Sequence, residues 1–240
     1  MTPPRSQAID RAPRLSRLVR DRLAERIYQR DLVPGDALPS ESALAREYDV
    51  SKSVIREALS ELAALQVIEI QQGRPTTIRA VSAAPLATLF DLAVCAGEAG
   101  LHDMLELRLA IECQAAAAAA ERRTPAQLAT LAALVEDLRA HLHDAEGWSA
   151  ANWHFHLTIM HAAGNPLFLL VFTALEKRIR DGQRLLFQQH EVRDPAQTLA
   201  RHEDIHQAIA AADPVAATAA MRRHFALALR TATRLDAARA

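Results

Sequence analysis

The stretch VSKSVIREAL, residues 50–59, decides the fold of the N-terminal part of the chain. Ser51 is a residue type that caps helices, so a helix is predicted from Ser51 to about Leu65. The apolar side chains of this segment recur three and four residues apart and form one stripe that must face a core. They are Ile55, Ala58, Leu59 and Leu62.

The opposite face of this helix carries polar and basic side chains. Lys52, Ser53 and Arg56 project there together, because residues three and four apart share a helix face. A positive, hydroxyl-bearing first turn suits the major groove of DNA, where Arg or Lys reads guanine and backbone amides meet phosphate. Periodicity alone favours an ordinary amphipathic helix whose cations are solvated.

Two further helices are predicted upstream of the quoted stretch. Ser40 can cap a short helix through Tyr48, and only a tight turn at Asp49-Val50 separates it from the next helix. Two short capped helices across a tight turn suggest a helix-turn-helix. Apolar residues from Leu15 onward also follow helical spacing, and Pro34-Gly35 is predicted to end that first helix.

Downstream, a small β-hairpin is predicted. Two β-prone runs, residues 67–71 and 76–79, surround a turn at residues 72–75. Residues 14–80 are therefore predicted to form a winged helix-turn-helix of three helices and a β-hairpin wing. Residues 1–13 precede it as a flexible basic arm.

Composition indicates a mainly helical, unexported protein. Half of the 240 residues are hydrophobic, only 4% are aromatic and there are seven glycines, which favours close-packed helices. The formal net charge is −1, but residues 1–30 hold eight arginines against three acidic residues. Two cysteines are too few for a disulfide framework, and no apolar signal segment or membrane span is evident, so a cytoplasmic location is expected.

After Ala80 the sequence changes to alanine-rich helical segments with clear punctuation. Thr124-Pro125 and Asp194-Pro195 each combine a capping residue with proline at the first helical position. Six or seven helices are expected between residues 84 and 236. Residues 81–240 are therefore predicted to form an all-α bundle of normal domain size.

The N-terminal motifs closely resemble the GntR regulator family. The resemblance covers residues 15–79 and rests on Pro34-Gly35, on LPSE at residues 38–41 and on the quoted stretch. It implies that Lys52, Ser53 and Arg56 lie in the major groove of double-stranded operator DNA. It also implies that the wing enters the minor groove through Gly73, Arg74, Pro75 and Thr76. Many members place arginine at the position of Ser42, where it assists DNA contact, so affinity or operator sequence is expected to differ here.

Four polar residues of the C-terminal half are predicted to point inward. Asn152 and His156 share a helical stripe with Trp148, Phe155 and Ile159, whereas His154 and His161 fall on the outer face. His202 and His224 also lie among apolar residues of their helices. For any one of these residues, a hydrogen-bonded core position is the commoner explanation. For the set, a metal site competes with that explanation.

Residues 84–236 are similar to the FCD ligand-binding domain of the FadR subgroup. The matching features include ELR at residues 106–108, the NWHFH segment at 152–156 and the GNP turn at 164–166. This resemblance implies a divalent metal, Zn²⁺ or Ni²⁺ most plausibly, held by Asn152, His156, His202 and His224. Family members more often carry Asp at the position of Asn152, so weaker metal binding or dependence on an effector carboxylate is expected. His206 is an alternative ligand to His202.

Arg108 is the predicted contact for the effector. The plainer interpretation is a surface salt bridge with Glu112, four residues further along the helix. By resemblance to the family, Arg108 faces the cavity instead, where its bidentate guanidinium suits a carboxylate.

The sequence as a whole predicts a homodimeric DNA-binding regulator, most plausibly a repressor, and not an enzyme. Its partners are operator DNA and a small organic acid effector. A hydrolase-like metalloenzyme using the histidines is one alternative, although it lacks a convincing general base and leaves the DNA-binding domain unexplained. A direct metal sensor is another.

Overall fold

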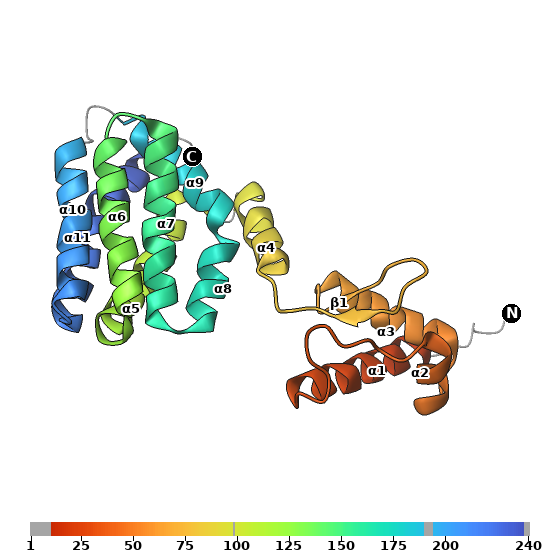
Figure 1. Cartoon of the computed structure of the whole chain (residues 1–240). Helices are drawn as coiled ribbons and strands as arrows, with labels where there is room; N and C mark the ends of the chain where they lie inside the picture. Colours follow the sequence, from red (N-terminus) through yellow and green to blue (C-terminus); the bar gives the residue numbers. More distant parts are fainter. Residues whose placement is uncertain (1–10, 98, 190–193, 238–240) are drawn as a thin grey trace, which may run out of the picture. The chain divides into compact units, whose positions relative to one another are not determined.

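A computed structural model describes residues 11–97, 99–189 and 194–237 (Figure 1). The chain divides into two compact units, residues 1–85 and 86–240. Among the described residues no helix is long and apolar enough to cross a membrane.

The N-terminal unit has the predicted three helices and hairpin. They are α1 (Arg11–Tyr28), α2 (Glu41–Glu47), α3 (Lys52–Ala64), β1 (Ile68–Glu69) and β2 (Thr77–Ile78). Ser40 and Ser51 cap α2 and α3, because their side chains accept hydrogen bonds from the backbone N–H groups three residues later. The antiparallel strands pair Ile68 with Ile78. The predicted apolar stripe of α3 is buried, so the helix is fixed with one face toward the core.

The first helix differs from its prediction at both ends. It begins at Arg11, inside the stretch predicted as a basic arm, and residues 1–10 lie outside the described residues. It ends at Tyr28, before Pro34-Gly35, because Arg30 takes a left-handed conformation with φ +63°. The N–H groups of Asp31 and Leu32 both donate to the carbonyl of Arg26, which closes the turn without a glycine.

The C-terminal unit is all helical in the described residues. Its helices are α4 (Ala84–Cys95), α5 (Leu101–Arg122), α6 (Pro125–Ala140), α7 (Ala145–Ala163), α8 (Pro166–Ala174), α9 (Glu176–Phe187), α10 (Pro195–Ala210) and α11 (Pro214–Ala237). These are eight helices in the described range, so the expected six or seven was wrong. The structure ends α8 and begins α9 at the single residue Leu175, where the sequence offers no proline or glycine to mark a boundary.

Helix α5 is central to the packing of this unit. It lies against α7 and α11, and four of its alanines are fully buried. Small side chains let neighbouring helices approach closely, which explains the alanine-rich composition. The buried alanines are Ala115, Ala116, Ala119 and Ala120. This packing holds Arg108 and Glu112, on the same helix, inside the unit.

Candidate functional site

The exposed face of α3 carries the predicted DNA-reading side chains. Lys52, Ser53 and Arg56 are all exposed, whereas the intervening Val54 and Ile55 are buried. Oγ of Ser53 lies 2.8 Å from Oγ of the capping Ser51, which holds that hydroxyl at the helix N-terminus. Basic and hydroxyl groups therefore meet the positive end of the helix dipole, an arrangement that attracts phosphate.

Arg56 makes an exposed ion pair with α2. Its Nε donates to Oε2 of Glu41 on α2 at 2.8 Å, but the two side chains are 66% and 41% exposed. Exposed ion pairs of this kind contribute little to stability, so Arg56 can exchange Glu41 for a nucleic-acid acceptor at small cost. Ser42, next to Glu41, is half-buried at the start of α2.

The wing presents its tip to solvent. Gly73 has φ +75°, a left-handed conformation that favours glycine, and it turns the chain between the two strands. Arg74 is exposed, and its guanidinium donates to Oε1 of Gln71 at 3.2 Å. Thr76 is half-buried where β2 begins. The predicted wing residues therefore cluster at one hairpin tip, with one cation among them.

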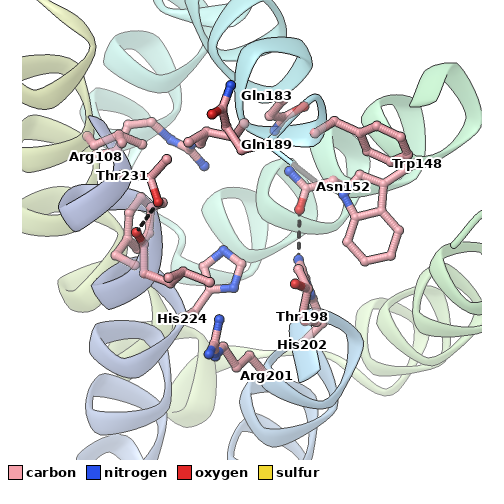
Figure 2. A pocket seen from close by; sticks show the side chains of 16 residues that line it. Arg108, Trp148, Asn152, Gln183, Gln189, Thr198, Arg201, His202, His224 and Thr231 are labelled. Atoms are coloured by element: carbon pink, nitrogen blue, oxygen red, sulfur yellow. Dashed lines mark hydrogen bonds between the residues drawn. The ribbon is translucent and has the colours of Figure 1, made fainter. Parts of the chain in front are cut away.

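Inside the helical unit the three predicted histidines lie close together, and two of them, His202 and His224, line one cavity (Figure 2). One ring nitrogen from each of His156, His202 and His224 lies within 4.8 Å of the others. The cavity has a volume of about 120 Å³. Polar residues from five helices line it, among them Arg108, Asn152, Gln183, Arg201, His202 and His224.

His202 contacts both the side-chain amide of Asn152 and the backbone of α10, the helix that carries His202. Its Nδ1 lies 2.9 Å from the carbonyl oxygen of Thr198, and its Nε2 lies 2.7 Å from Oδ1 of Asn152 (Figure 2). Burial, followed by the influence of His156, lowers the pKa of His202 to about 3, so the ring is neutral. A neutral imidazole has one N–H. That N–H can donate to the carbonyl of Thr198 or to Oδ1 of Asn152, but not to both. In the tautomer that donates to Thr198, Nε2 and Oδ1 both present electron pairs, which suits two ligands of one cation.

His156 is oriented by a carboxylate that the sequence analysis had assigned only as a surface partner. Its Nδ1 lies 2.5 Å from Oε2 of Glu112, and both side chains are fully buried. Oε1 of Glu112 accepts from Nε of Arg108 at 2.7 Å. Burial by itself raises the pKa of Glu112, but Arg108 and His156 outweigh it and hold that pKa below its usual range. A charged carboxylate thus lies against Nδ1 of the imidazole, and Nε2 has no hydrogen-bond partner among the described residues.

Several buried polar atoms at or near this cavity have no hydrogen-bond partner among the described residues. They include Nε2 of His156, Nδ1 of His224, one terminal nitrogen of Arg108 and Nε2 of Gln183, and the close contact of Nδ1 of His156 with Oε2 of Glu112 does not have hydrogen-bond geometry either. Such atoms are costly to bury unpaired, and they mark places where a ligand or ion completes the bonding. Burial and the neighbouring His202 and His156 also lower the pKa of His224 well below its ordinary value, so its neutral ring offers one nitrogen lone pair.

Arg108 is paired with Glu112, but the predicted surface salt bridge was wrong because the pair is buried, with exposed fractions of 5% and 0%. The guanidinium carbon lies 4.9 Å from the ring centre of Phe225 and the residue lines the cavity. It is therefore a buried cation that lines the same cavity as His202 and His224, and its role toward an effector stays a prediction.

The remaining histidine predictions agree with the structure. His154 and His161 are exposed on α7, and His206 lies outside the cluster formed by the other three. Sequence reasoning missed the role of Glu112 toward His156, because that contact joins α5 to α7. It also missed Gln183, for which the sequence offers no signal beyond its place in a helix.

The comparisons with known proteins agree with this division into a DNA-binding unit and a cavity-bearing unit. Residues 15–78 match the model for bacterial regulatory proteins of the gntR family, and residues 103–227 match the FCD domain. The chain is 32% identical over 200 residues to the HTH-type transcriptional regulator LutR of Bacillus subtilis, covering 81% of this chain and 90% of that protein.

Other relatives are also regulators. The galactonate operon transcriptional repressor of Escherichia coli is 28% identical, with 78% of this chain and 83% of that protein covered. A solved structure of a GntR protein from Streptococcus agalactiae superposes with a TM-score of 0.67 at 29% identity, covering 90% of this chain and 99% of the other. The chain therefore belongs to the gntR family of bacterial regulatory proteins, as a DNA-binding transcriptional regulator with an FCD domain and not as an enzyme.

Proposed function

We propose that this regulator is a cytoplasmic repressor of the FadR subgroup whose hold on its operator is controlled by a small carboxylate bound beside a divalent metal ion. The observation that carries the proposal is the cluster of His156, His202 and His224, which lies at the cavity that Asn152 also lines and in which ring nitrogens of His156 and His224 have no hydrogen-bond partner among the described residues. Two relatives named as repressors, NanR of Citrobacter rodentium and the galactonate operon repressor, support the sign of regulation.

The donor set fits a transition metal ion. His156, His202 and His224 would supply three imidazole nitrogens, and Asn152 would supply an amide oxygen. Imidazole suits Zn²⁺ and Ni²⁺, and a site with three histidines keeps positions open for another ligand. When bound, the metal would supply a positive charge that attracts an anionic ligand. Nδ1 of His202 contacts the carbonyl oxygen of Thr198, and Nδ1 of His156 contacts Glu112. Contacts of this kind to the second ring nitrogen are usual for metal-binding histidines.

The charges of the cavity favour a carboxylate effector. None of the four proposed metal ligands is a carboxylate, and Glu112, a buried carboxylate nearby, is already paired with Arg108. An effector carboxylate therefore completes the charge balance and meets the unpaired nitrogen of Arg108. The cavity volume of about 120 Å³ is well below the roughly 300–1,000 Å³ of pockets for drug-sized ligands, so the effector is small. The galactonate operon repressor is named for the operon of a sugar acid.

The decisive experiment measures metal content and operator release on the full-length protein. Protein purified without chelator or affinity tag is analysed for metal, then reloaded with Zn²⁺ or Ni²⁺. Affinity for an operator selected from random duplexes is measured with metal alone and with metal plus hydroxy acids, from glycolate to galactonate. We expect release only when metal and an acid are both present. Release by metal alone identifies a metal sensor, and protein that retains no metal after reloading has an ordinary polar pocket.

A homodimer is part of the same proposal, because the family resemblance implies one and a palindromic operator presents two half-sites. Sedimentation velocity of the full chain at micromolar concentration tests it. A mass of one chain, with and without operator DNA, contradicts the dimer while leaving the metal and effector measurements unaffected.

A further inference from the structure

A second arginine lines the cavity besides Arg108. Arg201 lies on α10 directly before His202 and is half-buried. In Figure 2 the ring of His224 lies between Arg108 and Arg201. The pKa of His224 supports this placement. Burial lowers that pKa most and the two neighbouring histidines follow, but the positive charges of Arg108 and Arg201 also contribute. The cavity therefore has a guanidinium group on each side of His224.

Arg201 has no acidic partner among the residues that the structure describes. Its Nη2 donates to the uncharged amide oxygen of Gln197, one turn earlier on α10. The two acidic residues that follow Arg201 on the helix, Glu203 and Asp204, pair with arginines of other helices. The charge of Arg201 is thus left for a ligand of the cavity.

The two guanidinium groups differ in how their charge is balanced. Arg108 is buried against Glu112, so that pair is neutral as a whole. An effector carboxylate placed beside the metal ion and Arg108, as proposed above, leaves Arg201 without a counter-charge. A second anionic group on the same molecule supplies that counter-charge. Guanidinium groups bind carboxylates and phosphates through paired, charge-assisted hydrogen bonds, which are stronger than those between neutral groups.

We propose that Arg201 is a specificity-determining residue that binds a second anionic group of the effector, so that the preferred effectors are small acids with two anionic groups. This inference rests on the proposed effector site and narrows the class of acid that the site takes. The carboxylate beside the metal ion and Arg108 is common to all small hydroxy acids. The group at Arg201 distinguishes diacids from monoacids of the same size.

The proposal is tested with pairs of acids in which a methyl group is replaced by a carboxylate. Tartronate is compared with lactate, malate with α-hydroxybutyrate, and α-hydroxyglutarate with α-hydroxyvalerate. The members of each pair have nearly the same shape and differ in charge, and the pairs differ in length. Phosphoglycolate is added, and whether it or a diacid binds more tightly distinguishes phosphate from carboxylate as the second group.

Binding to Ni²⁺-loaded full-length protein is measured by calorimetry. The Ni²⁺ that the protein retains is measured afterwards, because a diacid in solution can also remove the ion. In the pair whose length suits the two anion sites, we expect the diacid to bind about tenfold or more tightly than its partner, because hydrogen bonds to charged groups contribute more than neutral ones.

Variants of Arg201 assign that preference to one side chain. Arg201→Gln removes the charge but keeps an amide donor, so it should bind each diacid about as weakly as the matching monoacid. Its binding of monoacids should stay at the wild-type level, and its binding of Ni²⁺ should not be weakened. Arg201→Lys keeps a cation and should retain part of the preference. Arg230→Gln is the control, because Arg230 is an exposed cation of α11 outside the cavity lining, and it should behave as wild type.

Three results would each overturn the inference while the proposed effector site stands. They are a wild type that binds metal and monoacids but no diacid more tightly, a preference for diacids that persists in Arg201→Gln, and an equal weakening of both members of a pair in that variant. A wild type that binds neither metal nor any acid contradicts the proposed function itself, and the role of Arg201 fails with it.

Discussion

Oε2 of Glu112 lies 2.5 Å from Nδ1 of His156, and neither side chain is exposed to solvent. One ring nitrogen of His156 also lies within 4.8 Å of a ring nitrogen of His202 and of His224. The carboxylate contacts a histidine that is a proposed metal ligand. Proteins commonly orient histidine ligands by such a contact to the ring nitrogen that does not bind the metal.

Glu112→Gln should weaken metal binding without touching a proposed metal ligand. Loss of the carboxylate removes the charge that orients His156 and leaves Arg108 buried without its partner, so we expect about 10- to 100-fold weaker Zn²⁺ binding. The same change should destabilise the fold by about 3 to 5 kcal/mol. Calorimetry on protein shown by circular dichroism to be folded separates the two effects. Glu106→Gln is the control, since Glu106 is exposed on the same helix, and equal Zn²⁺ affinity in both variants contradicts the orienting role.

Asn152→Asp should tighten metal binding, because it adds a negative charge to an otherwise neutral set of ligands. His202→Ala should abolish both metal binding and the response to acids, whereas His154→Ala, on the exposed face of the same helix as Asn152, should affect neither. Competition with a metal-binding dye measures the affinities. A tighter site in His154→Ala, or no change in Asn152→Asp, argues against the proposed ligand set.

Arg56→Ala, Lys52→Ala and Ser53→Ala should weaken operator binding while the helical unit stays folded. A side chain that reads a base contributes about 1 to 3 kcal/mol, whereas loss of a phosphate contact lowers the salt dependence of binding. Fluorescence anisotropy over a range of salt concentrations distinguishes the two. Arg230→Ala removes an exposed cation from α11 and serves as control. Wild-type affinity in all three α3 variants would remove this face as the recognition surface.

The docking of α4 should weaken at acid pH. Partial burial raises the pKa of Asp91, but the hydrogen bond and charge of Arg178, aided by Lys177, more than reverse this and lower the pKa below 3.8. A lowered carboxyl pKa means that the contribution to stability is complete above the unfolded value and is lost as pH falls through the folded value. Hydrogen exchange protection of residues 86–95 should therefore be level from neutral pH to about pH 4 and fall below it. In Asp91→Asn, protection should be low across the range, and an acid-induced fall as large as in the wild type contradicts the assignment.

Local sequence was sufficient to predict most of the architecture. Ser40 and Ser51 cap their helices as expected, because capping depends on one side chain and on N–H groups three residues away. The inward direction of Asn152 and His156 followed from helical periodicity in the same way. Boundaries without such signals were missed, as at Arg30 and Leu175, where backbone conformation and packing end a helix that composition would continue.

What the sequence determined by itself was the set of elements, the face of each helix and, through family resemblance, the four proposed metal ligands. Only the tertiary structure decided which side chains complete the cavity. Glu112 meets His156 across two helices, Gln183 faces the cavity from α9, and Arg178 pairs with Asp91 across 87 residues of chain. Helical periodicity specifies which way a side chain points from its own axis, but not the neighbour it meets. That is settled by how the helices pack together, a property of the whole unit and not of any one segment.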